Sequence, residues 1–415
     1  YSSQEVYANV YYSFNQSGGM KPSSALKPGI IVQSIANPDL TWETTEQYNV
    51  GLDLGLLRNR ITLSVDAYFK KTFDLLLSKP LDYSMGFATM MYNSGSLENK
   101  GLEFVLNTVN VSHRNFSWTS SFNLSFNRNK VLDLGDNAAL TFNGGNLYNE
   151  AFILQPGQPV GTMYGFIYDG VYTYADYKNF YIDQDPSKGL VSKEQCTAIY
   201  ERIKGGAEKA VLMDGQPKYA GGVPLPGSAK FRDIVGEDNN VTPEDRTYIG
   251  NSAPKFFGGF VNKFEFKGFD INLFMQFSYG NKFLVANYFP LQGYDTRNIL
   301  QDIYDNAWRP YRDSNIWPDY TIDSYKSVAS SMVVEDGSYL KIKDLTIGYT
   351  FPTQWLNSIG ISKARIYLTG QNLFTFTKFK WYDPEVASNN PIMGGFYRFT
   401  YPSSRTIITG ISLSF

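Results

Sequence analysis

The feature that most constrains the fold of this chain is a period-two alternation of apolar and polar residues that recurs along its length. In residues 61–69, 116–126 and 269–277 every second residue is mostly apolar, and the residues between are mainly Asn, Ser, Thr, Gln and Asp. Successive side chains of a β-strand point to opposite faces, so this pattern predicts strands with one apolar and one polar face. We therefore expect an all-β protein.

The connections between these strands are short at one end and long at the other. Lys267 and Gly268 form a two-residue connection, and residues 56–60 and 111–115 are also short. The long connections span 74–100, 129–160, 281–332 and 378–403. About ten strands of about ten or more residues, with short turns and long loops, are typical of membrane β-barrels. A soluble β-sandwich or propeller is the alternative, although its strands usually have about five or six residues.

Composition narrows the function classes. Aromatic residues make up 16% of the 415 residues and charged residues only 18%, yet no run of about 20 apolar residues occurs, which excludes a bundle of transmembrane helices. A net charge of −2 gives no basic footprint for nucleic acid. One cysteine, Cys196, and one histidine, His113, exclude an internal disulfide and a His- or Cys-based zinc site. We interpret His113 as a solvated turn residue.

One segment departs from the alternation and contains helix formers. Residues 186–213 predict a short helix that Ser192 caps, with Gln195 at the third position, and that ends near Ile203. Cys196 is then a buried residue of that helix. We expect residues 175–250 to be a loop insertion that contains this helix and an acidic loop.

Several stretches resemble the barrel motifs of the SusC/RagA family of TonB-dependent outer-membrane transporters. They are NPDLTWETTEQYNVGLDLGLL and its continuation (37–77), NSGSLENKGLEFVLNT (93–108), VGTMYGFIYDGVY (160–172), 244–281, VEDGSYLKIKDLTIGYTFP (334–352), 364–386 and YPSSRTIITGISLSF (401–415). The last strand ends on Phe415, as in the targeting signal of outer-membrane barrels. The matching stretches cover most of the chain and follow one another in the same order as in the family.

This resemblance implies a fold and a position in a larger protein. Residues 1–415 are expected to form the C-terminal part of an antiparallel transmembrane β-barrel of about 22 strands, with long extracellular loops and one short helical insertion. Neither a plug domain nor a TonB-contact motif is recognisable in the sequence. We therefore expect the chain to be the C-terminal half of a longer polypeptide.

The resemblance also implies a function. A transporter of this kind sits in a Bacteroidetes-type outer membrane and imports oligosaccharides or oligopeptides, with a SusD-like surface lipoprotein as a lid and TonB as the energy source. Two transporter–lid pairs are expected to associate. The alternatives are a surface carbohydrate-binding β-protein, or a passive porin or adhesin. No enzymatic activity is expected, because nothing distinguishes a catalytic carboxylate pair among the 39 Asp and Glu residues.

Residues 231–246 form the one candidate metal site, because carboxylates alternating with small residues can wrap a hard cation such as Ca²⁺ or Mg²⁺. Its candidate ligands are Asp233, Glu237, Asp238 and Asp245. Val235 and Glu237 depart from the calcium-loop pattern of the family, and an acidic surface turn is the alternative. No cofactor is required by any motif.

Aromatic residues in the long connections are the candidate contacts for a ligand or a lid, since Tyr and Trp rings stack on sugars and anchor protein interfaces. The alternative is that they pack within the loops. The candidates are Tyr83, Tyr92, Trp308, Trp317, Trp381 and Tyr382.

Overall fold

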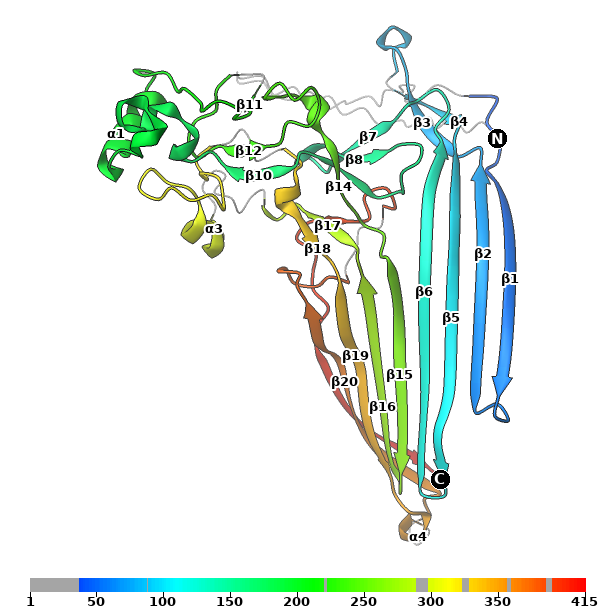
Figure 1. Cartoon of the computed structure of the whole chain (residues 1–415). Coiled ribbons are helices and arrows are strands. Elements are labelled where there is room, and N and C mark those ends of the chain that lie inside the picture. The colour runs from blue at the N-terminus through cyan, green and yellow to red at the C-terminus, as the bar shows by residue number, and fades with distance from the viewer. Residues whose placement is uncertain are drawn as a thin grey trace, which may run out of the picture.

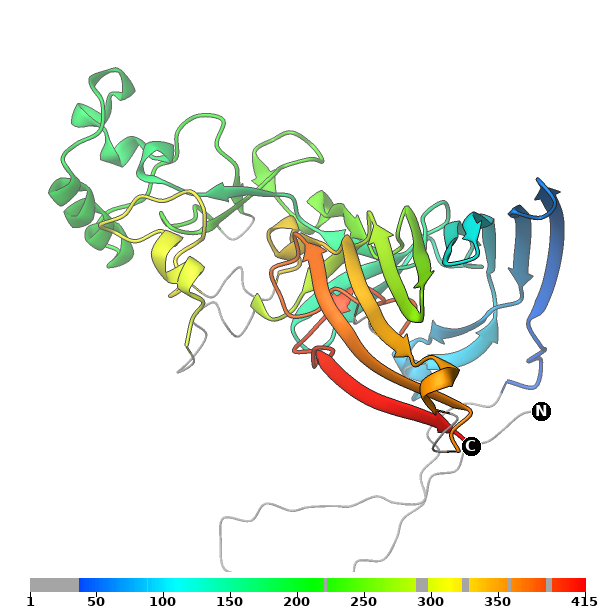
Figure 2. The same ribbon diagram turned by 90° about the horizontal axis from the view of Figure 1, so that it is seen from below.

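The structure, a computed structural model, describes residues 37–415 apart from 88, 220–221, 289–297, 323–327, 357–359 and 386–389. One antiparallel sheet of nine strands dominates it, in the order β1-β2-β5-β6-β15-β16-β19-β20-β22 (Figure 1). Seen along the strands, this sheet curves into a partial barrel wall with β1 and β22 at its two edges (Figure 2). The strands are β1 Thr44–Leu56, β2 Ile61–Phe73, β5 Ser96–His113, β6 Phe116–Asp133, β15 Phe256–Phe266, β16 Phe269–Tyr279, β19 Tyr339–Thr350, β20 Lys363–Thr377 and β22 Thr406–Ser414.

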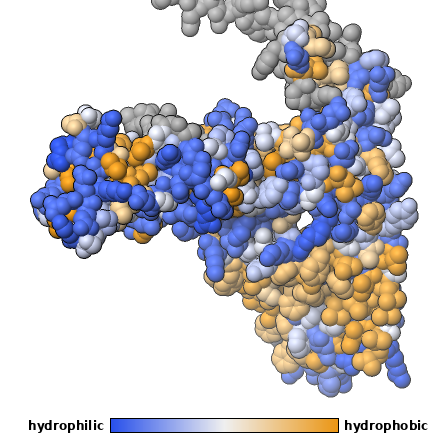
Figure 3. All heavy atoms as spheres, turned by 45° about the horizontal axis from the view of Figure 1, so that its top comes forward, coloured by the Kyte–Doolittle hydropathy of each residue, from blue (hydrophilic) through white to orange (hydrophobic). Residues whose placement is uncertain are grey.

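Strand register turns the alternation of the sequence into two continuous faces. Phe264 of β15 lies opposite Trp118 of β6 and Ile271 of β16, so apolar residues of neighbouring strands stand side by side. Lys263 and Asn272, one residue along, lie opposite each other on the other face. We call the apolar face the outer wall and the polar face the inner wall. Figure 3 shows the apolar residues gathered on the outside of the barrel wall, below a hydrophilic region.

At one end of the sheet, here called the turn end, three of the four connections are short. Residues 57–60, 114–115 and 267–268 join neighbouring strands, while 351–362 contains the helix α4, Thr353–Leu356. The tightest turn has Lys267 and Gly268 at φ 45° and 89°, a backbone that favours glycine in a two-residue hairpin. A Cβ atom at position 268 would lie 2.7 Å from the carbonyl oxygen of Thr350, so a side chain there would also clash.

At the opposite end, the loop end, residues 74–95, 134–255, 280–338 and 378–405 contain the remaining described elements. The helices are α1 Lys193–Lys204 and α3 Gln301–Asn306, with 3-10 turns at Tyr83–Met85, Tyr174–Asp176, Lys178–Phe180, Ile182–Gln184, Pro186–Lys188, Pro243–Asp245 and Ser331–Val333. The strands are β3 Leu76–Pro80, β4 Thr89–Asn93, β7 Leu140–Gly144, β8 Tyr148–Leu154, β9 Thr162–Gly165, β10 Tyr168–Val171, β11 Lys218–Tyr219, β12 Ala229–Phe231, β13 Asn240–Val241, β14 Thr247–Asn251, β17 Lys282–Val285, β18 Val334–Asp336 and β21 Phe396–Tyr397.

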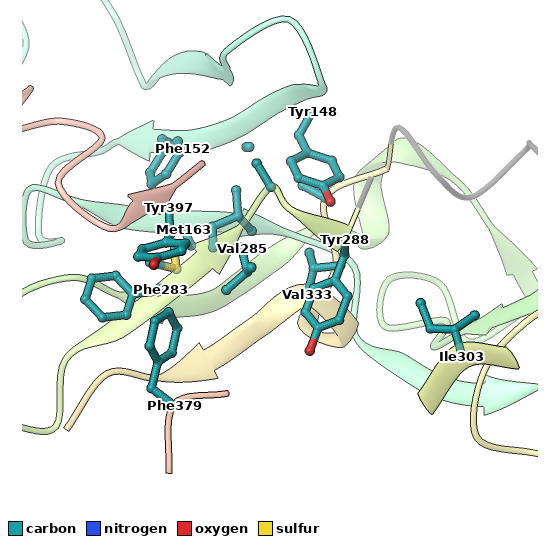
Figure 4. Close-up of a cluster of buried hydrophobic side chains, with 14 of the residues drawn as sticks. Tyr148, Phe152, Met163, Phe283, Val285, Tyr288, Ile303, Val333, Phe379 and Tyr397 are labelled. Atoms are coloured by element: carbon teal, nitrogen blue, oxygen red, sulfur yellow. The ribbon is translucent and has the colours of Figure 1, made fainter. Parts of the chain in front are cut away.

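The hydrophobic cores lie at the loop end, above the barrel wall. One core joins β8, β9, β17 and β21, and in Figure 4 the rings of Phe283, Phe379 and Tyr397 gather within it, with centroids 4.9 to 6.0 Å apart. A second core lies in the lobe formed by residues 166–245 and 298–322, where α1 packs against Trp308. These cores make the loop end a packed structure in its own right.

The helix within this lobe confirms its sequence prediction. The Ser192 side chain accepts a hydrogen bond from the backbone N–H of Gln195, and the Gln195 side chain accepts one from the backbone N–H of Ser192. This reciprocal capping box satisfies two backbone donors at the start of α1. Cys196 is buried, as expected, and His113 is exposed at the end of β5.

The predicted all-β barrel class is confirmed, with differences in strand extent. The sheet has nine strands where about ten were expected, and β5 begins at Ser96 and β6 runs to Asp133, beyond the predicted loop boundaries. These strand ends carry polar residues such as Glu98 and Lys100, so the alternation of apolar and polar residues does not extend to them. Glu98 and Lys100 form an ion pair at 3.0 Å. Among the described residues, no helix is long and apolar enough to cross a membrane.

Candidate functional site

The inner wall is lined with side chains that hydrogen bond between strands, across one intervening strand in one case and between direct neighbours in another. The Arg365 guanidinium of β20 donates two hydrogen bonds to the Asp270 carboxylate of β16, at 2.9 and 2.5 Å. The hydroxyls of Thr346 and Thr369 lie 2.8 Å apart between β19 and β20. These groups present donors and acceptors on the concave side of the wall. Such a surface can be wetted by water or contact a polar solute.

The outer wall is apolar and aromatic. Trp118 stacks on Phe264 with ring centroids 5.5 Å apart, and Phe256 stacks on Tyr279 at 5.0 Å. Near the C-terminus, Ile411 is 69% exposed. A water-soluble protein rarely exposes a continuous apolar surface of this extent. The outer wall therefore requires an apolar surrounding.

Polar residues on this outer wall are hydrogen bonded to one another. Asn110, within a β-bulge of β5, donates to the Ser120 hydroxyl of β6 at 2.7 Å. Ser120 in turn donates to the Asn262 side-chain oxygen of β15 at 2.8 Å, and the Trp118 indole N–H donates to the same oxygen at 3.1 Å. This chain of bonds satisfies polar groups that an apolar environment would otherwise destabilise.

A buried network of ion pairs lies where the inner wall meets the loop end. The Lys341 ammonium of β19, whose side chain is 2% exposed, lies 3.0 Å from Asp383 and 2.9 Å from Glu385. Lys343 also reaches Glu385, at 2.7 Å. Burial disfavours the charged carboxylates, but hydrogen bonds to them outweigh it, so the pKa of Asp383 and that of Glu385 are both lowered. The network ties the 378–405 connection to the barrel wall.

A second carboxylate, that of Asp313, organises the lobe through its hydrogen bonds. Asp313 accepts a hydrogen bond from the Trp308 indole N–H at 2.7 Å and another from the Tyr174 backbone N–H at 3.0 Å. Burial raises the pKa of Asp313 despite these bonds. Nearby, Lys230 and Asp176 form a mostly buried ion pair at 2.7 Å. The bond between Tyr174 and Asp313 joins the 134–255 and 280–338 connections, and the Lys230–Asp176 pair holds the first of them together.

The acidic loop at 231–246 is organised around Asp245. Its side-chain oxygens accept hydrogen bonds from the backbone N–H groups of Ile234, Val235 and Thr242, at 2.7, 2.8 and 2.7 Å. Burial opposes ionisation of Asp245, but these bonds lower its pKa below the usual range. Asp245 therefore acts as the internal cap of this loop.

The other candidate ligands in this loop point elsewhere. Glu237 and Asp238 are exposed, and Asp238 accepts from the Asn240 backbone N–H at 2.9 Å. The Asp233 oxygens are buried without a hydrogen-bond partner among the described residues. No group of three or more His, Cys, Asp or Glu side chains arranged to hold a metal occurs in the described part of the chain. The residues therefore do not fit a four-carboxylate site, and the predicted Ca²⁺ or Mg²⁺ ion stays an untested prediction.

Two of the candidate aromatic residues are core residues, which corrects their assignment as ligand or lid contacts. Trp308 is fully buried against α1, and Trp317 is 7% exposed and donates to Asp302 at 3.1 Å. Trp308 lies in the core of the lobe, whereas Trp317 lies in the first core, with its ring 5.3 Å from that of Tyr288. The sequence pattern gave no sign of this burial, because the long connections carry no alternation.

The remaining candidate aromatics lie nearer the surface. Trp381 is half-buried and donates to Glu335 at 3.2 Å. Tyr382 is 70% exposed and Tyr92 is 38% exposed, both at the loop end. The side chain of Tyr83 lies outside the described part of the structure. Tyr92 and Tyr382 are therefore the members of this set best placed for contact with another molecule.

The comparisons with known proteins agree with this architecture. A family model described as "TonB dependent receptor-like, beta-barrel" matches residues 2–192. TonB-dependent receptor P3 of Formosa agariphila is 33% identical over 399 residues, which cover 93% of this chain and 36% of that receptor. TonB-dependent receptor SusC of Bacteroides thetaiotaomicron is 26% identical over 392 residues, which cover 91% of this chain and 32% of SusC. The chain thus spans about a third of the length of these relatives.

A solved structure shares the fold across the whole chain. The RagAB peptide transporter superposes with a TM-score of 0.70 at 22% identity, over 100% of this chain and 39% of the transporter chain. The chain resembles the SusC/RagA family of TonB-dependent barrels over more than 90% of its length. The resemblance noted in the sequence is therefore confirmed.

Proposed function

We propose that this chain forms the C-terminal wall of an outer-membrane, TonB-dependent importer. The observation that carries the proposal is the continuous two-faced sheet, with an apolar outer wall and a hydrogen-bonding inner wall. Lipid tails surround such an outer wall, and water or a polar solute occupies the space beside the inner wall. The turn end then faces the periplasm and the loop end faces the cell exterior, because barrels of this kind have short periplasmic turns.

The imported molecule belongs, in this proposal, to the oligosaccharides or oligopeptides. A polar solute of that kind exchanges its hydrogen bonds to water for those of inner-wall groups such as Thr346 and Thr369. TonB, acting through the part of the protein that precedes this barrel portion, would supply the energy of import. No catalytic residue is needed in such a cycle, so we propose no enzymatic role.

A SusD-like lipoprotein is the proposed partner at the loop end, with two transporter–lid pairs in the assembly. The exposed Tyr382 supports a protein contact there, since it lies two residues beyond a segment that Glu335 holds through the Lys380 backbone N–H. An exposed ring on a fixed backbone loses little entropy on binding. The Lys341 network anchors the same connection on the other side of Tyr382, through Asp383 and Glu385.

Extraction and uptake together test the proposal, with the full-length polypeptide expressed in its native membrane. We expect the protein to require detergent for extraction, to migrate faster on gels before heating than after, and to support uptake only while TonB is present. Free solubility in aqueous buffer would favour a surface carbohydrate-binding protein instead. Uptake that is independent of TonB would favour a passive porin.

A further inference from the structure

The turn end of the barrel carries a one-sided distribution of charge. Its ionisable residues in the three short turns are basic, with Arg58 and Arg60 in the first, Arg114 in the second and Lys267 in the third. The fourth connection, 351–362, has no charged residue, and Lys363 follows it directly. At the loop end the two longest connections contain more Asp and Glu than Lys and Arg. The two ends of the wall therefore differ in sign.

These basic side chains are available to an outside partner. Arg58, Arg114, Lys267 and Lys363 are all exposed, and no ion pair between described residues includes any of them. Arg60 differs, because its guanidinium donates to the backbone oxygens of the β5 bulge at 3.0 to 3.3 Å. The four remaining cations sit on short connections or a strand end, so their positions are set by the barrel itself.

An aromatic band on the outer wall runs beside these cations. Phe116 and Phe266 contact each other across β6 and β15, with ring centroids 6.4 Å apart. Further round the wall, Phe269 and Tyr349 lie at 4.6 Å, and Tyr349 leads through Phe351 to the exposed Trp355 of α4. Aromatic rings at the end of an apolar wall mark the boundary between lipid tails and headgroups.

One of these cations contacts the aromatic band directly. The Lys267 ammonium lies 5.4 Å from the centre of the Phe266 ring, on the edge of the aromatic band. Arg114, Lys267 and Lys363 line an open hollow of about 610 Å³ at the turn end, together with the acidic residues Glu265 and Asp270. Arg365 forms an ion pair with Asp270, so the other cations of the hollow outnumber its remaining carboxylate, that of Glu265. The rim of the turn end therefore keeps an excess of positive charge where the outer wall stops.

We propose that this basic rim, formed by Arg58, Arg114, Lys267 and Lys363, binds the phosphate headgroups of anionic phospholipids in the periplasmic leaflet. The proposal rests on the proposed function, which places the outer wall in a bilayer and the turn end on its periplasmic side. Continuity with the apolar outer wall argues for lipid as the occupant, because a headgroup is found wherever such a wall ends. Charge complementarity then selects anionic over zwitterionic headgroups. An acidic protein would not need the adjoining aromatic band.

Lipid selectivity of the full-length protein tests this assignment. The protein is reconstituted into phosphatidylcholine bilayers that contain traces of spin-labelled phosphatidylglycerol or phosphatidylcholine, and the motionally restricted fraction of each probe is measured. We expect the restricted fraction to show about a threefold preference for phosphatidylglycerol at low salt, which added NaCl reduces. The variant that carries Arg58→Gln, Arg114→Gln, Lys267→Gln and Lys363→Gln should show almost no preference.

A matched control carries the same number of charge removals at the loop end, and it should keep the wild-type preference. Its substitutions are Lys193→Gln, Lys204→Gln, Lys218→Gln and Lys380→Gln, all of exposed residues. If the fourfold rim variant does not fold, the Arg58/Arg114 and Lys267/Lys363 double variants and the salt titration of the wild type give the same readout.

Three results would overturn the proposal. They are a preference that the rim variant retains, a preference that the loop-end control loses equally, and a preference that salt does not change. A protein that cannot be incorporated into any bilayer would contradict the proposed function itself, whereas incorporation without lipid preference would contradict only the basic rim.

Discussion

Lys341 shows how much a single side chain can determine at the mouth of this barrel wall. Its ammonium is buried between Asp383 and Glu385, which lie more than 40 residues away in the sequence. Lys341 lies opposite Gln276 of β16, and the alternation of β19 does not indicate a partner for its charge. The pairing depends on the 378–405 connection folding back over β19, which no local pattern encodes. Lys341 and Asp383 lie in the motifs at 334–352 and 364–386, which resemble barrel motifs of the family. In the structure the two residues form an ion pair that joins these motifs.

We expect Lys341→Met to destabilise this region by about 3 kcal/mol, because it leaves two carboxylates partly buried without their cation. Limited proteolysis within residues 378–405 and the midpoint of thermal unfolding would measure the effect on the folded barrel. Lys380→Met, at an exposed position in the same connection, is the matched control and should change neither. Equal behaviour of the two variants would contradict the anchoring role.

Acid should weaken the same network. The pKa values of Asp383 and Glu385 are lowered in the folded protein, so their stabilisation is fully present above the ordinary carboxyl pKa of about 4. It is lost as the pH falls through their lowered values. We expect the difference in unfolding temperature between wild type and an Asp383→Asn/Glu385→Gln variant to shrink between pH 7 and pH 3. A difference that stays constant over this range would rule the linkage out.

The elements differ in how far sequence alone could predict them. The helix α1 was predicted with its cap and close to its last residue, because Ser192 and Gln195 form a local signal three residues apart. Strands of the wall were predicted by their alternation, but their loop-end extensions were not, since polar residues dominate there. Among the small sheets of the loop end, β9 lies within the motif recognised at 160–172, whereas β8, β17 and β21 were not predicted. Most residues of β8 and β17 are buried, so these short strands carry no alternation.

Ser192→Ala should cost about 1 kcal/mol of the local stability of α1, since it removes one half of the capping box. Hydrogen exchange of the α1 amides would report the loss as faster exchange in the first turn. Lys193→Ala, at the adjacent exposed position, keeps the cap and serves as the control. The barrel wall itself should exchange as before, because α1 packs within the lobe.

At the scale of the whole molecule, the distinction between outer and inner wall is the property that the sequence predicted best. A period of two is enough to assign every residue of a long strand to one of two faces. The strand register then aligns the like faces of neighbouring strands. The sequence does not show how the loop end packs, where Trp308 and Trp317 are core residues rather than the expected contact residues. In the candidate metal loop, the sequence likewise does not show that Asp245 accepts hydrogen bonds from backbone groups, because a sequence does not position those groups.

Adjacent residues of β16 provide a direct test of which face meets lipid. Leu273→Lys places a charge on the outer wall and should cost about 2 to 4 kcal/mol if that position lies near the middle of the bilayer. Asn272→Lys places the same charge on the inner wall and should be nearly neutral. Urea unfolding of the full-length protein in phospholipid vesicles would compare them. Equal costs would show that the two faces share one environment.

The order of strands also has a consequence for how the wall assembles. The seam between β6 and β15 joins strands that the 134–255 connection separates, which makes it the most distant pairing in the sheet. That same seam carries the Trp118–Phe264, Phe116–Phe266, Phe122–Phe260 and Phe126–Phe256 ring pairs, together with the Ser120–Asn262 hydrogen bond. Cross-strand aromatic contacts are therefore concentrated at the pairing that loop-closure entropy opposes most. They fix the register between the β5–β6 hairpin and the β15–β16 hairpin.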